Sequence, residues 1–314
     1  MASSRILLIP LGLATALLAG CTGTTVEAGS ATPSVGAPVA VRPSSASTSP
    51  AAPVAVSPSA PAAGRPVSTP GRRAVAVYYL ADTGGTGPRL YREFHLRPAT
   101  PAVVRDAVDA MLHEAPYDAG YRSLWPRDTR VIGVSITANL ATVNLSRQAL
   151  GGSAGSAFEV ASLQQLVWTV TGAAPAVTSV QVLIEGRSSG IVDRREIADF
   201  WGAGGLAAQP LRRASQFEIL GPVWVLAPTT GAVVGPDVTI AGTESVFEGT
   251  VSWEVRAGTT VVRRGFVTGV GAPGRGTWSA KVRLAPGSYV VRAWAASAKD
   301  GSVTFLDDKA FRVR

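Results

Sequence analysis

The sequence predicts an α+β domain with the element order β-β-α-β-β-α-β, followed by an all-β sandwich. Three observations lead to this fold class. Between residues 74 and 201, two stretches with apolar residues at helical spacing alternate with strand-like segments. Between residues 217 and 314, short strand-like segments recur with turn residues between them and no helical stretch. Before residue 74, recurrent prolines disfavour both kinds of element.

The first domain is predicted to contain two helices that pack on a single sheet. Thr100 and Pro101 provide a cap and a first-turn proline for the first helix. Gly172 stands where a residue in the left-handed conformation would end the second helix. The expected strands are residues 75–79, 90–96, 130–137, 140–145 and 177–185, and the helices follow residue 100 and cover residues 155–171.

The second domain is predicted to be a sandwich of short strands separated by turns. Tyr289 follows a sharp turn, as in a tyrosine corner, where the tyrosine hydroxyl bonds to nearby backbone. No cysteine pair is present to cross-link the sheets, so Trp253 and its neighbours are expected to fill the core. The expected strands are residues 223–226, 238–241, 250–256, 261–268, 278–284, 289–295 and 310–313.

Both domains resemble known families. Residues 112–116, 125–131 and 141–146 carry the motifs of the GerMN domain of sporulation and germination proteins, with Asn144 where the family often has aspartate. The second domain resembles the immunoglobulin-like Gmad2 domain, which often follows GerMN. The segments that carry this second resemblance are residues 240–243, 247–251, 271–274 and 298–301, together with Pro228, Gly231 and Pro236. The resemblance implies a role in sporulation, germination or envelope regulation, and the GerMN family has no recognised catalytic residues.

The first twenty residues are typical of a lipoprotein signal peptide. A short start with Arg5 precedes an apolar run that is too short to span a bilayer. The run ends at Cys21, the only cysteine of the chain, in a sequence that looks like a lipobox. We therefore expect a lipid anchor with palmitate-type acyl chains on Cys21, at the outer face of the cytoplasmic membrane. The alternative is an ordinary secretory signal with an incidental cysteine.

Two segments are expected to act as linkers. Residues 21–73 are rich in proline, alanine and serine and contain no aromatic side chain, so we expect a disordered spacer. Residues 202–216 are expected to join domain 74–201 to domain 217–314. The formal charge of +8 suggests an acidic partner, such as wall polymers or anionic lipid headgroups. The alternative is compositional bias, because all but three of the 29 basic residues are arginine.

Several motifs suggest chemistry, but each lacks a required part. Ser153 lies in a G-x-S-x-G sequence, yet both histidines, His95 and His113, precede it in the chain, whereas the nucleophile elbow needs a later histidine. Residues 269–274 fit the dinucleotide fingerprint in letters only, because a strand rather than a helix follows. Aspartates 300, 307 and 308 do not match a calcium loop and are interpreted as a solvated strand edge. His95 is expected to point outward from its strand. We assign no catalytic residue, metal or cofactor.

Aromatic and arginine side chains are the candidate contact residues. Tyr117, Tyr121 and Trp125 are either binding anchors or plugs for the end of a small core. Arginine beside aromatic residues is typical of interface centres, and this combination occurs near the expected joint between the domains. The residues are Arg187, Arg194, Arg195, Arg212 and Arg213, with Phe200 and Trp201. Phe200 and Trp201 are equally consistent with holding the two domains together.

Two classes of function remain. The first is a non-catalytic interaction module that contacts an envelope protein or wall polymer, and no nucleic acid. The alternative is a cell-wall-directed hydrolase or a polysaccharide-binding protein. The missing nucleophile, base and metal-ligand sets favour the interaction module.

We predict that the change Cys21→Ala releases the protein from membranes. Stable anchoring takes two or more acyl chains, which only a lipidated cysteine would supply here. Detergent phase partitioning and the mass of the mature N-terminus measure the effect. A variant that is processed and partitions like the wild type would contradict the lipid anchor.

Overall fold

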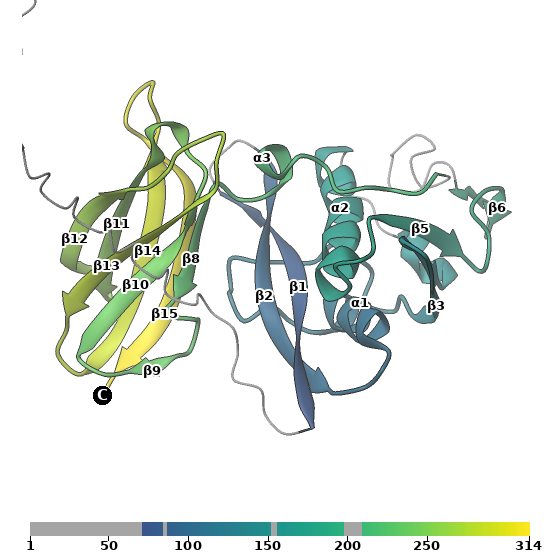
Figure 1. Ribbon diagram of the computed structural model, residues 1–314, viewed down its shortest axis with the longest axis horizontal. Helices are drawn as coiled ribbons and strands as arrows, with labels where there is room; N and C mark the ends of the chain where they lie inside the picture. Colours follow the sequence, from purple (N-terminus) through teal and green to yellow (C-terminus); the bar gives the residue numbers. More distant parts are fainter. Residues whose placement is uncertain (1–70, 84–86, 152–155, 198–208) are drawn as a thin grey trace, which may run out of the picture. The chain divides into compact units, whose positions relative to one another are not determined.

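A computed structural model of the chain describes residues 71–83, 87–151, 156–197 and 209–314 (Figure 1). The predicted signal peptide and Cys21 lie outside these ranges. All of the described residues belong to one compact unit. In the described part of the chain, none of the helices combines the length and the apolar character needed to cross a membrane.

The first domain has the predicted element order, with short additions. Its main elements are β1 (Arg72–Asp82), β2 (Pro88–Pro98), α1 (Val103–His113), β3 (Val131–Thr137), β4 (Leu140–Leu145), α2 (Ser156–Ala173) and β5 (Ser179–Ile184). The additions are the 3-10 helix η1 (Arg147–Gly151) and the strands β6 (Ile191–Val192) and β7 (Arg195–Glu196). The hairpin turn between β3 and β4 falls at residues 138 and 139, as predicted.

The strands form two sheets, which corrects the expectation of one sheet under both helices. β1 and β2 form an antiparallel pair, and β3, β4 and β5 form a separate sheet in which β4 and β5 are parallel. The remaining edge of β1 is occupied in other ways. The backbone groups of Leu80 exchange hydrogen bonds with Arg122, and the N–H of Tyr78 donates to the Thr169 hydroxyl of α2 at 3.1 Å. These partners satisfy backbone groups that a third strand would otherwise use.

Both helices bury the apolar faces that the sequence predicts, but their ends differ from the prediction. α1 begins at Val103 rather than at Pro101. The Thr100 hydroxyl accepts from the N–H of Ala102 at 3.1 Å and donates to Asp106 at 2.5 Å, ahead of the helix. α2 continues through Gly172, which is not in the left-handed conformation. A side chain there would approach the ring of Tyr78 to 3.4 Å, so this glycine permits close packing of α2 on β1.

The second domain is a two-sheet sandwich that contains all seven predicted strands (Figure 1). One sheet has the order β13-β10-β8 and the other β12-β11-β14-β15-β9. The strands are β8 (Val223–Ala227), β9 (Val233–Val234), β10 (Asp237–Glu244), β11 (Thr250–Ala257), β12 (Thr260–Thr268), β13 (Gly276–Arg283), β14 (Gly287–Ala296) and β15 (Val303–Val313). The sequence did not indicate the short strand β9 or the four-residue helix α3 (Gln216–Ile219), and it placed the start of β15 seven residues too late.

The core of the sandwich forms as the sequence predicts. Trp253 is buried between the sheets with apolar residues of both, including Ile240 and Val291. The hydroxyl of Tyr289 donates to the carbonyl oxygen of Ala285 at 2.9 Å, which confirms the tyrosine corner. The dinucleotide-like residues 269–274 form the loop between β12 and β13, as expected.

We predict that Gly242→Ala strongly destabilises the sandwich. A Cβ at this position of β10 would overlap the carbonyl oxygen of Trp224 and lie 2.8 Å from the ring of Trp278. Because a backbone atom cannot move aside cheaply, we expect a loss of about 3 kcal/mol or more. Thermal unfolding of the full chain measures it. Gly235→Ala is the matched control, since an added methyl there meets nothing within 4 Å. Equal melting temperatures for the two variants would contradict this packing.

Candidate functional site

A buried lysine on β15 is the centre of a charged cluster. The side chain of Lys309 is 9% exposed. Its ammonium group lies 4.4 Å from the centre of the Tyr121 ring. The ammonium donates hydrogen bonds to Asp118 at 2.6 Å, Asp307 at 2.6 Å, the Tyr121 hydroxyl at 2.8 Å and the carbonyl oxygen of Asp308 at 3.1 Å. Asp118 and Tyr121 belong to the segment after α1, so the cluster connects the first domain to β15.

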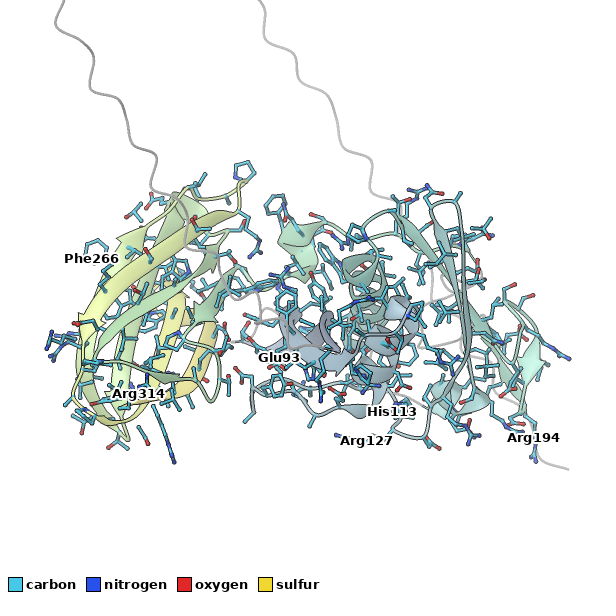
Figure 2. The ribbon with its side chains drawn as sticks, turned by 60° about the horizontal axis from the view of Figure 1, so that its bottom comes forward. Glu93, His113, Arg127, Arg194, Phe266 and Arg314 are labelled. Carbon is cyan, nitrogen blue, oxygen red and sulfur yellow. The ribbon has the colours of Figure 1, made fainter. Side chains whose placement is uncertain are left out.

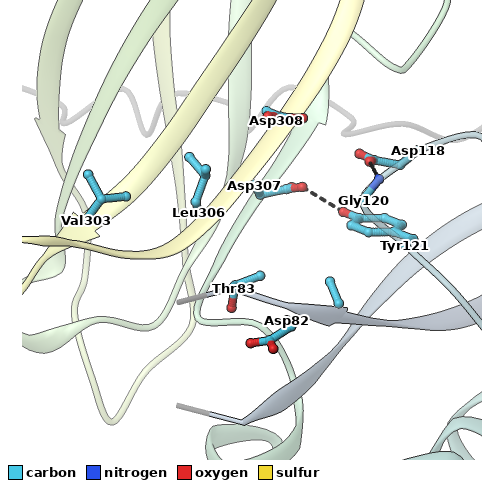
Figure 3. Close-up of a pocket in the computed structure, with 10 residues that line it drawn as sticks. Asp82, Thr83, Asp118, Gly120, Tyr121, Val303, Leu306, Asp307 and Asp308 are labelled. Atoms are coloured by element: carbon cyan, nitrogen blue, oxygen red, sulfur yellow. Dashed lines mark hydrogen bonds between the residues drawn. The ribbon is translucent and has the colours of Figure 1, made fainter. Parts of the chain in front are cut away.

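Asp307 has a full set of partners, which corrects its interpretation as part of a solvated strand edge. Its carboxylate accepts from the Tyr121 hydroxyl at 2.7 Å (Figure 3) and from the backbone N–H of Val225, on β8, at 2.6 Å. Burial raises the pKa of Asp307, while Lys309 acts in the opposite direction. Burial alone would lower the pKa of Lys309, but the two carboxylates raise it overall. The lysine is therefore held in its charged form.

The alternation of side chains along β15 could have indicated part of this cluster from the sequence. Asp307 and Lys309 share a face with Phe311 and Val313, because side chains two apart on a strand point the same way. Phe311 and Val313 are buried in the sandwich core. An acid and a base in register with core residues indicate an inward-facing pair, and the predicted strand began too late to include them.

A small cavity opens beside the cluster (Figure 3). Its volume is about 350 Å³, and four of its lining residues are the aspartates 82, 118, 307 and 308. Asp118 and Asp307 are engaged by Lys309. No group of three or more His, Cys, Asp or Glu side chains within the described ranges is arranged to hold a metal ion.

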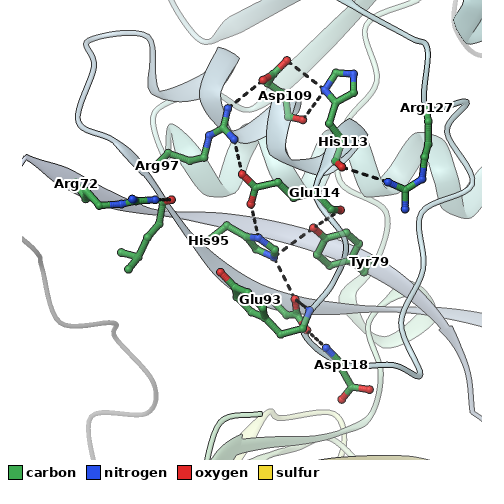
Figure 4. Close-up of polar contacts among 12 residues, drawn as sticks. Arg72, Tyr79, Glu93, His95, Arg97, Asp109, His113, Glu114, Asp118 and Arg127 are labelled. Atoms are coloured by element: carbon green, nitrogen blue, oxygen red, sulfur yellow. Dashed lines mark hydrogen bonds and ion pairs between the residues drawn. The ribbon is translucent and has the colours of Figure 1, made fainter. Parts of the chain in front are cut away.

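His95 is buried, which corrects the expectation that it points outward. It is 1% exposed, and its ring stacks on that of Tyr117 with the centres 4.4 Å apart. Nδ1 lies 2.6 Å from the carboxylate of Glu114, and Nε2 lies 3.1 Å from that of Glu93 and 3.2 Å from the Tyr79 hydroxyl (Figure 4). The polar residues of β2 suggested a solvent-facing side, but the segment after α1 covers them. Both ring nitrogens therefore have partners.

Glu93 connects the histidine to the segment that holds Asp118. Its carboxylate accepts from the backbone N–H groups of Tyr117 and Asp118, both at 2.9 Å. On the other side of the ring, Glu114 accepts from Arg97, which also pairs with Asp109 at 3.0 Å (Figure 4). Burial would raise the pKa of Glu114, but the hydrogen bonds from Arg97 and His95 lower it overall. A continuous polar chain thus runs from α1 to β15.

The aromatic residues after α1 separate into two kinds. Tyr121 and Trp125 are buried, as expected for plugs of the core, and Trp125 donates to the carbonyl oxygen of Ser162 at 3.2 Å. Tyr121 also stacks on Tyr91. Tyr117 is 56% exposed while one face of its ring covers His95. Of the three, it is the one that presents a ring to solvent.

The candidate contact arginines have different surroundings. Arg194 is exposed at the turn between β6 and β7, and Arg195 donates to the carbonyl oxygen of Leu150 in η1. Arg212 and Arg213 line a groove beside β1 and α2. Arg187 is exposed. The pair Arg194 and Arg195 and the pair Arg212 and Arg213 therefore have different neighbours. Phe200, Trp201 and Ser153 lie outside the described residues.

Asn144 has a structural role at the position where the GerMN family often has aspartate. Its side-chain oxygen accepts from the backbone N–H of Gly186 at 2.8 Å. Glu185 and Gly186 both have positive φ in the turn that follows β5. An amide oxygen and a carboxylate oxygen can both accept this bond, so the departure from the family pattern leaves the turn intact.

Comparison with protein families confirms both resemblances. The model described as "Germane: Sporulation and spore germination" matches residues 76–190. The model described as "Gmad2: Immunoglobulin-like domain of bacterial spore germination" matches residues 222–302. No curated protein matches the chain.

Solved structures show similarity to parts of the chain. The tandem GerMN domains of the sporulation protein GerM from Bacillus subtilis align at 17% identity and a TM-score of 0.37, over 48% of this chain and 49% of that one. This chain therefore spans about half the length of that relative. The first GerMN domain of GerM aligns at 17% identity and a TM-score of 0.34, over 46% and 98%. A putative lipoprotein from Clostridium perfringens aligns at 15% identity and a TM-score of 0.29, over 47% and 93%.

We predict that Lys309→Met destabilises the chain by about 3–5 kcal/mol, the usual cost of breaking a buried ion pair from one side. Asp118 and Asp307 would remain buried without their cation. Urea denaturation of the full chain measures the loss. Lys281→Met, on the exposed side of β13, is the control and should cost little.

The companion change Asp307→Asn should restore part of the stability of Lys309→Met, because it removes one of the two uncompensated carboxylates. Lys309→Met with wild-type stability would show that the cluster carries no structural role.

Proposed function

We propose that this chain, a GerMN-like domain followed by an immunoglobulin-like Gmad2 domain, works as a non-catalytic interaction module at the cell envelope. Both domain types are associated with sporulation and spore germination, which supports a role in that process or in envelope regulation. The lipobox sequence at Cys21 supports attachment to the outer face of the cytoplasmic membrane. The partner is an envelope protein or a wall polymer.

One observation carries the non-catalytic part of the proposal. Two side chains suited to acid–base chemistry, those of His95 and Lys309, take part in internal bonding instead. His95 lies between two carboxylates under the ring of Tyr117, and Lys309 is surrounded by hydrogen-bond acceptors. A general base must reach the proton that it removes, and a nucleophile must reach its substrate. Groups in these positions instead hold the segment after α1 and β15 in place.

Fixed internal groups suit a protein that acts through its surface. Binding is tighter when the contact residues are already ordered, because less conformational entropy is lost on association. The polar chain from Glu114 to Lys309 orders the segment between them, including the exposed ring of Tyr117. This supports a rigid surface as the working part of the molecule.

Trp201→Ala tests the expected contact region. We expect capture of the envelope partner by the full chain to be lost while the melting temperature stays unchanged, because an aromatic anchor at an interface centre contributes strongly to affinity. Affinity capture from cell envelopes and thermal unfolding are the two measurements. Phe266→Ala is the control, since it removes an exposed aromatic ring from β12, in the second domain (Figure 2).

Two outcomes would count against these expectations. Capture that survives Trp201→Ala while the melting temperature falls would show that the ring holds the domains together and that the contact lies elsewhere. Ser153→Ala should leave capture and cell phenotype intact. A loss of function in a normally folded Ser153→Ala protein would contradict the non-catalytic proposal and favour a hydrolase.

A further inference from the structure

A groove of about 670 Å³ lies beside the β1–β2 pair and the C-terminal end of α2. We name it the arginine groove after three residues that line it, which are Arg92 of β2 and the consecutive residues Arg212 and Arg213. Its lining also includes the rings of Tyr78 and Phe94 and contains no aspartate or glutamate. The walls of this groove are therefore positively charged and partly aromatic.

Two of the three guanidinium groups of the groove, those of Arg92 and Arg213, rest on aromatic rings instead of pairing with acids. Arg213 lies 4.1 Å from the centre of the Trp168 ring, and its Nε donates to the Thr171 hydroxyl at 2.7 Å. Arg92 lies 4.8 Å from the centre of the Phe94 ring. Within the part of the chain that the structure describes, none of the three arginines forms an ion pair, and the buried Nε of Arg92 has no hydrogen-bond partner. Arg212 and Arg213 are exposed, so their charge and their terminal N–H groups can reach a ligand.

Rings and arginines alternate along this side of the first domain. The ring of Trp168 lies 5.6 Å from that of Tyr78, measured between centres. Further along, the ring of Trp224 lies 5.8 Å from the guanidinium of Arg92 and 5.1 Å from that of Arg275. The rings of Trp168 and Trp224 are buried and support the guanidinium groups from below, so the positive groups are spread out over an apolar base. This spacing suits a ligand whose negative charges are separated by uncharged units.

The hydrogen-bonding groups of the lining favour a ligand whose charged groups act only as acceptors. The Thr171 hydroxyl donates to the carbonyl oxygen of Val167 at 2.6 Å and accepts from Arg213. The Thr178 hydroxyl accepts from Asn139 at 2.9 Å. The Thr178 hydroxyl keeps its own hydrogen to donate, but the guanidinium N–H groups are the main side-chain donors of the lining. A phosphodiester offers acceptors alone, whereas an acidic peptide brings backbone N–H donors that also need partners.

We propose that the arginine groove binds a linear polyanion that carries one phosphodiester per repeat, separated by uncharged polyol or sugar units. The planar guanidinium fork matches the oxygens of a phosphate, and the half-buried ring of Phe94, which lines the groove beside Arg92, can contact the uncharged units. The inference rests on the proposed function, because it names the class of envelope polymer that the module would contact.

The test measures binding of a fluorescently labelled, short oligomer of glycerol phosphate to the purified full chain in neutral detergent. We expect saturable binding that weakens with added salt. The triple change Arg92→Gln, Arg212→Gln and Arg213→Gln should weaken it about 100-fold or more, since each charge-assisted contact is worth roughly tenfold. Arg130→Gln, Arg264→Gln and Arg312→Gln together remove the same charge from exposed positions elsewhere and should change the affinity by less than about threefold.

A single change keeps the test decisive if the groove triple variant folds poorly. The side chain of Arg212 makes no hydrogen bond or ion pair in the described part of the chain. Arg212→Gln should therefore keep the wild-type melting temperature and still bind roughly tenfold more weakly. Unchanged affinity in this well-folded variant would overturn the proposal.

Three other results would also overturn it. Equal losses in both triple variants would indicate attraction to net charge alone. A polyglutamate of matched charge that binds as tightly, with the same sensitivity to the groove changes, would indicate an acidic protein partner. Absence of saturable binding would exclude the ligand class.

The groove proposal and the proposed function can fail separately. If the chain captures an envelope protein and the groove changes do not affect this capture, the proposed function stays intact. A catalytic role for Ser153 would contradict the proposed function but would not affect the groove.

Discussion

The buried ammonium group of Lys309 imposes the strictest constraint on this structure. A charge removed from water costs several kcal/mol unless acceptors surround it. Its partners come from distant parts of the sequence, with Asp118 on the segment after α1 and Asp307 on β15 itself. Asp307 in turn accepts from β8. The lysine is therefore satisfied only when the first domain and both of these strands are in place together, and each of them depends on the others.

Apolar contacts and buried charges have different roles around this cluster. Tyr91 stacks on Tyr121 with the ring centres 5.0 Å apart, and Trp224 of β8 is buried in the core of the first domain. Burial of such rings supplies favourable energy but tolerates small shifts. Hydrogen bonds to Lys309 tolerate much less, because their geometry is directional. We therefore attribute the stability of the contact between the first domain and strands β8 and β15 mainly to the aromatic rings. The hydrogen bonds to Lys309 fix how the two sides of this contact are aligned.

The sequence predicted what depends on local pattern. The order of the elements along the first domain, the hairpin at residues 138–139 and the seven strands of the sandwich follow from alternation and turn residues, which short segments contain. The division into two sheets could not be predicted, because it depends on Thr169 and Arg122 reaching the edge of β1. The candidate site as a whole could not be predicted either, because it also depends on residues that are distant in the sequence. Lys309 and Asp118 are 191 positions apart, and only the fold brings them together.

One strand contributes to both the internal polar chain and the arginine groove. Tyr91, Glu93 and His95 of β2 point toward the segment after α1, while Arg92 and Phe94 line the groove on the other face. β1 and β2 pair without a bulge from Arg72 with Pro98 to Asp82 with Pro88. A slip of one residue would exchange the two faces, placing a guanidinium in the interior and the histidine in the groove. The partners of Glu93 and His95 therefore also determine where the groove presents its positive charge.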